Sequence, residues 1–128
     1  MIKGTQDTHL TRDRSSIGRF VRAFYGEIRQ HAILGPIFNE KIGAHWEEHF
    51  ETLTDFWMNV LLGARSYKGN PFGVHRQVTA LKEEHFDMWL SVFHPVAAKM
   101  LDPDMAAAAS EKAERIASSL RNGLFFKI

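Results

Sequence analysis

The 128-residue chain contains no cysteine. This excludes disulfide bonds, thiolate zinc sites, cysteine-bound iron–sulfur clusters and cysteine nucleophiles. An excess of one charge sign is also missing, because 16 Lys and Arg residues face 15 Asp and Glu residues, giving a formal net charge of +1. Such a balance provides no overall field that attracts nucleic acid or anionic lipid. We therefore expect neither a nucleic-acid partner nor a membrane partner.

Long apolar runs are missing as well, and none approaches the ~20 residues of a membrane-spanning helix. The polar N-terminus carries no signal-peptide core. With 45% hydrophobic residues, the chain is nevertheless too apolar for a disordered protein. We expect a cytoplasmic protein with a polar tail at residues 1–12 and a single domain at residues 13–128, since this length does not accommodate two cores.

In the first half of the chain, apolar residues recur with helical spacing. This pattern predicts one helix over residues 13–32 and another over residues 44–62, which stops at Gly63. Between them, Gly35 and Pro36 are predicted to break the chain, with a short helical turn from Pro36 through residue 38.

The middle of the chain is less regular. Residues 63–71 carry turn chemistry and no periodicity, and residues 71–78 are predicted to form one or two helical turns. Thr79 is a plausible cap for the next helix, which runs to Met100 and should be kinked at Pro95 unless the helix opens locally there.

A last helix is predicted to begin after residues 102–104 (Asp-Pro-Asp) and to end near residues 122–123. Its small and aliphatic residues share one face: Ala106, Ala109, Ala113, Ile116, Leu120 and Leu124. Strand-like alternation is not evident anywhere in the sequence. The fold class predicted is all-α, with four main helices.

One short pattern imitates a zinc site. Residues 45–49 read His-Trp-Glu-Glu-His, which formally matches a zinc-peptidase motif with two histidines one turn apart. Such enzymes need a third ligand and a substrate cleft, usually in a much larger chain. We therefore favour a solvated helix face carrying His45, Glu47 and Glu48, with only His49 turned inward.

His75 stands apart, just beyond the predicted turn and beside apolar residues. Tyr25, His49 and Trp89 occupy the inward phase of three different helices, in a chain with ten Phe, three Trp and two Tyr residues. Each buried donor needs a partner, because leaving it unpaired costs about 1–3 kcal/mol. Water or backbone carbonyls would serve in a purely structural core. A ligand such as haem also fits, since an imidazole binds its iron and aromatic rings line its plane.

Several blocks of the sequence, in matching order and spacing, resemble the group III truncated haemoglobins. These blocks are FYGEIRQHAILGPIFNEKIG (24–43), HWEEHFETLTDFWMNVLLGARSYKGNP (45–71) with Val-His at 74–75, and EEHFDMWLSVF (83–93). With AERIASSLRNGLFF near the C-terminus, the resemblance covers roughly residues 14–126. Like that group, the chain has no paired-glycine motifs of the other truncated groups.

The resemblance implies a truncated globin, a sandwich of two helices on two around haem b. His75 matches the proximal iron ligand, whose Nδ1–H would need an acceptor. Tyr25, His49 and Trp89 match distal positions that face a bound gas. Four further residues match positions that line the macrocycle, although each is as well explained as ordinary core: Phe24, Phe38, Leu53 and Phe86.

The same resemblance implies that O₂, NO and CO bind at the iron. Several donors beside the ligand would slow O₂ release, which favours NO dioxygenation or peroxide chemistry over O₂ transport. Turnover would require a separate reductase or a soluble reductant, because the sequence shows no flavin or nicotinamide motif. Lys68 and Arg76 are candidate partners of the haem propionates. A gas or redox sensor, and a structural helical domain without cofactor, remain alternatives.

Overall fold

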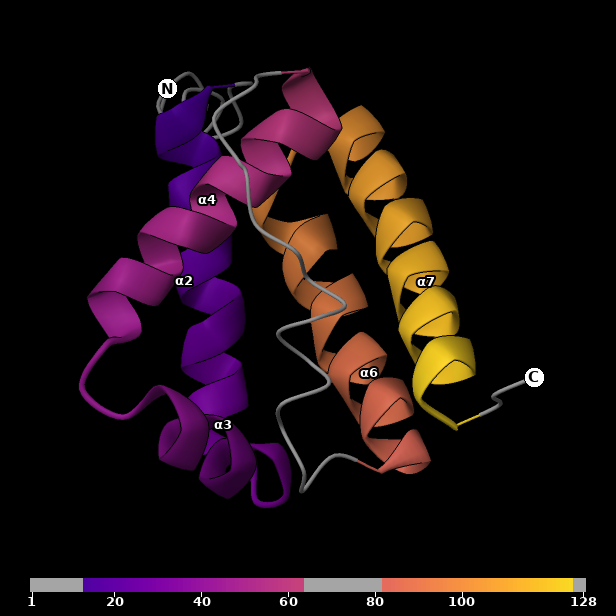
Figure 1. Ribbon diagram of the computed structural model, residues 1–128. Helices are drawn as coiled ribbons and strands as arrows, with labels where there is room; N and C mark the ends of the chain where they lie inside the picture. The colour runs from indigo at the N-terminus through magenta and orange to yellow at the C-terminus, as the bar shows by residue number, and fades with distance from the viewer. Residues whose placement is uncertain (1–12, 64–81, 126–128) are drawn as a thin grey trace.

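The computed structural model describes residues 13–63 and 82–125. These two stretches are helical and contain no strand, which confirms the all-α fold class. The tail at 1–12, the helical turns predicted at 71–78 and most of the turn predicted at 63–71 lie outside the described residues. The helices are α2 (Arg14–Gln30), α3 (Leu34–Ile42), α4 (Trp46–Leu62), α6 (Glu83–Met100) and α7 (Pro103–Phe125) (Figure 1).

The helices form two pairs. In Figure 1, α4 crosses over α2, and α6 and α7 lie side by side, while α2 contacts α6 and so joins the pairs. This arrangement is the predicted sandwich of two helices on two, with α3 packed mainly against α2. None of the helices in the described stretches combines the length and hydropathy of a bilayer-spanning segment.

Helix α2 forms the centre of the structure. It begins at an N-cap, Asp13, whose carboxylate accepts the Ser16 N–H at 2.9 Å. It ends at Gln30, two residues earlier than predicted, because the next residue, His31, adopts extended backbone angles. The apolar residues that recur with helical spacing here are all buried: Ile17, Phe20, Val21, Phe24, Tyr25 and Ile28.

The predicted break at Gly35 and Pro36 is wrong, because both residues lie in the first turn of α3. Pro36 is tolerated there, since the first N–H groups of a helix have no partner within the helix. The imidazole Nδ1 of His31 accepts the N–H of Ile33 and of Leu34, each at 3.1 Å, and so caps this end. Gly35 instead permits a close backbone approach, because a Cβ there would lie 2.6 Å from the Arg29 carbonyl oxygen.

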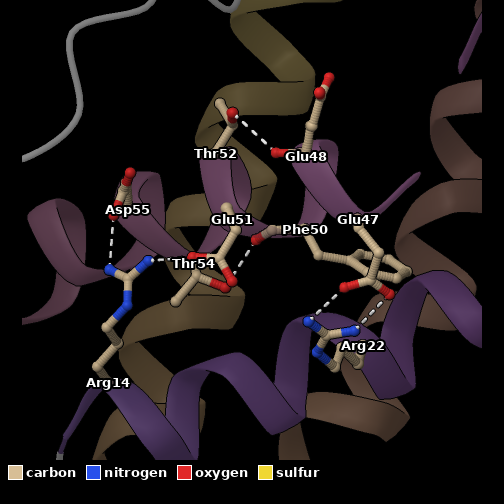
Figure 2. A network of polar contacts seen from close by, with 9 residues as sticks. All are labelled: Arg14, Arg22, Glu47, Glu48, Phe50, Glu51, Thr52, Thr54 and Asp55. Atoms are coloured by element: carbon tan, nitrogen blue, oxygen red, sulfur yellow. Dashed lines mark hydrogen bonds and ion pairs between the residues drawn. The ribbon is translucent and has the colours of Figure 1, made fainter. Parts of the chain in front are cut away.

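Helix α4 begins two residues later than predicted and ends, as predicted, at Gly63, which has a left-handed φ of 75°. On the exposed side, two arginines of α2 form ion pairs with carboxylates of α4 (Figure 2). Arg14 pairs with Glu51 at 2.8 Å and Asp55 at 2.6 Å, and Arg22 pairs with Glu47 at 2.9 Å. Each exposed pair contributes only about 0–1 kcal/mol, so buried side chains must set the crossing of α2 and α4.

Helix α6 begins at Glu83 with Lys82 as its N-cap, so the predicted cap at Thr79 is wrong. The Nδ1 atom of the buried His85 accepts the Lys82 N–H at 2.9 Å, which stabilises this start. The helix continues through Pro95 to Met100, at the cost of the helical hydrogen bond that the proline nitrogen cannot donate.

The stop and new start predicted around residues 102–104 are confirmed. Asp102 accepts the Met105 N–H at 2.9 Å through its carboxylate, and α7 follows. This helix continues to Phe125, slightly past the predicted end. Four small residues on its buried face allow it to lie close to its neighbours: Ala106, Ala109, Ala113 and Ala117.

The core is built mainly of aromatic rings between α2, α4 and α6. Phe93 of α6 meets Phe20 and Phe24 of α2 edge-on, with ring centroids 5.3 and 5.1 Å apart. Trp57 of α4 joins them, 5.3 Å from Phe93. Edge-to-face pairs at these distances contribute about 0.5–1.5 kcal/mol beyond the area they bury. These rings fix the distance between α2 and α6.

The close approach at Gly35 makes a testable prediction. A Gly35→Ala substitution should lower the free energy of unfolding by about 1–3 kcal/mol, because the new methyl group meets backbone and not a movable side chain. Gly26 is the matched control, since nothing lies within 4 Å of its Cβ position. Gly26 lies within α2, where alanine favours the helix more than glycine does. Gly26→Ala should therefore raise the free energy of unfolding by about 0.5–1 kcal/mol. Urea unfolding of both variants measures the difference, and equal effects would contradict the close approach.

Candidate functional site

The predicted donors meet around Tyr25, on the buried face of α2. Only 6% of this residue is exposed. Its ring centroid lies 4.6 Å from that of Phe24, 5.5 Å from that of His49 and 6.1 Å from that of Phe38. A phenol buried among rings from three helices is an unusual choice for a core position unless its hydroxyl has a partner.

That partner is Trp89 of α6, whose indole N–H donates a hydrogen bond to the Tyr25 hydroxyl oxygen. Burial raises the pKa of Tyr25 to about 12, and the hydrogen bond from Trp89 lowers it only in part. Tyr25 is therefore a neutral phenol at physiological pH. Since its oxygen accepts from Trp89, its own O–H remains a donor for another acceptor.

His49 lies on the other side of Tyr25, on α4. It is half-buried, and its ring stands nearly perpendicular to the rings of Tyr25 and Trp46, at 83° and 84°, with both centroids 5.5 Å away. The structure thus brings Tyr25, His49 and Trp89 together from three helices. The sequence placed all three on inward helix faces, and their predicted role beside a bound gas stays a prediction.

The residues expected to line a macrocycle are not all brought to this place. Phe24 contacts both Tyr25 and Trp89, and Phe38 lies beside Tyr25. Leu53 follows His49 by one turn of α4 and is half-buried against the same core. Phe86 instead packs in a separate small cluster with α7 residues, formed with Ala117 and Leu120.

One residue of this site was not singled out by the sequence. Trp46 packs against His49, and its indole N–H donates to the Asn39 side-chain oxygen at 3.1 Å. The Asn39 amide in turn donates to the Arg29 carbonyl at 3.3 Å, and the Arg29 guanidinium lies 4.7 Å from the Trp46 ring. No local pattern in the sequence links Trp46 to Asn39.

The other described histidines have structural partners. His94 bridges α6 and α7, with one ring nitrogen 2.9 Å from the Ser110 hydroxyl and the other 2.6 Å from Glu114. His31 and His85 cap helix starts. His45 is exposed and lies 3.2 Å from Glu48. Of the histidines in residues 13–63 and 82–125, His49 is distinguished by aromatic rings on two sides.

The zinc-peptidase pattern gains no support. His45, Glu47 and Glu48 are exposed, as predicted for a solvated face. Within the part of the chain that the structure describes, no three His, Asp or Glu side chains gather as a metal site would require. His75, Lys68 and Arg76 lie outside the described residues, so their predicted roles stay predictions.

The raised pKa of Tyr25 predicts a loss of stability in alkali. The pKa is about 10 in the unfolded chain and about 12 in the folded one, so the folded state holds its proton longer. The resulting stabilisation is complete below pH ~10 and is lost as the pH rises towards ~12, in total about 3 kcal/mol. Urea unfolding across this range should show a falling free energy, and the Tyr25→Phe variant should show a shallower fall. Identical slopes would contradict the burial argument.

Known proteins provide an independent comparison, although no protein-family model matches the chain. Over 118 residues it is 32% identical to the group 3 truncated hemoglobin ctb of Campylobacter jejuni, covering 90% of this chain and 93% of that protein. The crystal structure of the group III truncated hemoglobin from Campylobacter jejuni matches with a TM-score of 0.83, covering 88% of this chain and 91% of that one. The fold is therefore a truncated globin, and the chain belongs to the group III truncated haemoglobins.

Proposed function

We propose that the chain binds haem b and takes O₂, NO and CO as ligands, with Tyr25, His49 and Trp89 on the ligand side. The observation that carries the proposal is the convergence of these three donors from α2, α4 and α6 within one aromatic cluster. Because the chain belongs to the truncated haemoglobins, we interpret the cluster as the side of a haem at which a gas binds.

The surroundings of the donors fit a flat, largely apolar group. Phe38, Leu53 and Trp89 are large apolar side chains that are only half-buried within the chain. A macrocycle would cover such surfaces, and burial gains about 25 cal/mol per Å² of apolar area. The haem supplies an iron atom at which a diatomic ligand binds. We assign its axial ligand to His75, on the basis of the family resemblance.

Haem uptake is the first test. The purified protein should be red, with a strong Soret band, when hemin is supplied during expression. His75→Gly should abolish or cripple haem uptake, because it removes the axial nitrogen. His45→Ala is the matched control, since this histidine is exposed on α4 and should leave uptake intact. A colourless wild-type protein, or equal uptake by the His75 variant, would contradict the assignment.

The donors act by favouring ligands that gain negative charge. Because the Tyr25 oxygen accepts the Trp89 N–H, the tyrosine is held in one orientation, and its own O–H donates towards the ligand. His49 provides a second donor in the tautomer that presents an N–H. Hydrogen bonds to charged groups are each worth about 1.5–3 kcal/mol, so together they slow ligand release by orders of magnitude.

Slow release suits chemistry on the ligand better than transport of the ligand. We therefore propose NO dioxygenation, in which NO and O₂ form nitrate with the uptake of one electron, or alternatively a peroxide reaction. A separate reductase or a soluble reductant would supply the electron. The donors would contribute by polarising the ligand, and the aromatic cluster would keep bulk water away from it.

Removal of the donors should accelerate ligand release. We expect Tyr25→Phe and Trp89→Phe each to raise the O₂ dissociation rate about tenfold or more, measured by stopped-flow mixing. Leu120→Val, a core change in the separate cluster on α7, serves as a control for general loosening and should have little effect on this rate. Unchanged rates in both donor variants would overturn the donor argument.

Turnover itself is tested by NO consumption. The O₂-loaded protein, supplied with a reductase, should consume NO over many cycles, and Tyr25→Phe should consume it more slowly. Binding without repeated consumption would favour a gas or redox sensor.

A further inference from the structure

We infer that Trp46, held by Asn39, is a positioning residue that fixes the ring of His49 beside Tyr25. This inference deepens the proposed function and rests on it, because it concerns how one of the proposed donors is held. It assigns no contact with the ligand to Trp46 itself.

The first argument is the geometry of three rings, which we call the distal triangle: Tyr25, Trp46 and His49. Their centroids are 5.5 Å (Tyr25–His49), 5.5 Å (Trp46–His49) and 6.0 Å (Tyr25–Trp46) apart. The plane of the His49 ring is almost perpendicular to those of Tyr25 and Trp46, so each of these rings limits the rotation of the imidazole. A half-buried histidine without such neighbours would sample several rotamers.

The second argument is that the other two members of the distal triangle are anchored from outside it. Tyr25 is held by the hydrogen bond from Trp89 on α6. Trp46 is held by Asn39 on α3, whose side chain also donates to the Arg29 carbonyl at the end of α2. The imidazole is thereby packed against two rings whose positions are fixed by separate helices.

The third argument concerns Trp46 itself. Only 6% of it is exposed, and the Arg29 guanidinium covers its ring at 4.7 Å. Trp46 and His49 are three residues apart on α4, so they project on the same side of the helix. A shift of the indole would therefore open space directly beside the imidazole.

Another tryptophan of the same helix provides the contrast. Trp57 is buried to a similar degree, but it packs against Phe20 and Phe93 in the centre of the core. A Trp→Phe change at either position removes similar volume and one indole N–H. Only the change at position 46 touches the distal triangle.

The test is a double-mutant cycle on the haem-loaded protein. Trp46→Phe and Asn39→Leu should each raise the O₂ dissociation rate about two- to tenfold, because His49 then spends less time as a donor. In a His49→Leu background the same changes should have no further effect, since positioning acts only through the imidazole. Asn39→Asp keeps the acceptor for the indole but loses the N–H that donates to the Arg29 carbonyl, so it should raise the rate less than Asn39→Leu does.

Trp57→Phe is the control variant, and it should change the rate by the same factor in both backgrounds. Asn39→Leu keeps the test decisive if Trp46→Phe does not fold, because it removes none of the three rings of the distal triangle. A second readout is the NMR signal of the His49 ring, which should move in Asn39→Leu, where no ring beside it is replaced, and should stay in place in Trp57→Phe.

The outcomes separate the two proposals. If Trp46→Phe and Asn39→Leu leave the O₂ dissociation rate and the His49 signal unchanged, or act equally in the His49→Leu background, the positioning role is wrong. If His49→Leu alone leaves the rate unchanged, His49 is not a donor and that part of the proposed function fails. The NMR comparison then still decides whether Trp46 positions the ring.

Discussion

The aromatic contact between α2 and α6 is the constraint on which the rest of the site depends. Phe24 is almost fully buried and lies 5.3 Å from Trp89 and 5.1 Å from Phe93. This packing sets the separation across which the Trp89 N–H reaches the Tyr25 oxygen. The indole N–H and the phenol oxygen therefore satisfy each other within the protein. Under the proposed function, the donors are thus oriented before any ligand arrives, which lowers the reorganisation needed to bind one.

Helical phase was readable from the sequence, because it is a local property. The spacing of apolar residues placed Tyr25, His49 and Trp89 on inward faces, and the structure brings them together, while their role towards a ligand stays a prediction. Helix ends marked by strong local chemistry were also predicted, namely the left-handed stop at Gly63 and the new start after Asp102. The overall arrangement of the helices came from the resemblance to the truncated haemoglobins, because spacing alone does not specify which faces meet.

Features that depend on distant parts of the chain were not predicted. Gly35 read as a helix breaker, yet its role is to let two backbones approach each other, which only the folded chain reveals. The bond between Asn39 and Trp46 crosses from one helix to the next and has no local signature. Phe86 was matched to a position that lines the macrocycle, but the sequence did not show that it packs with the α7 residues Ala117 and Leu120.

The missing side chain at Gly35 has a consequence for how rigidly the site is supported. Gly35 and Asn39 are about one turn apart on α3. The backbone contact between Gly35 and Arg29 therefore also fixes where the Asn39 side chain meets the Arg29 carbonyl. Because α3 contacts the end of α2 through backbone atoms, the two helices have little freedom to move relative to each other. The support of Trp46 is therefore fixed, and this side of the site gains no extra room from a hinge between α2 and α3.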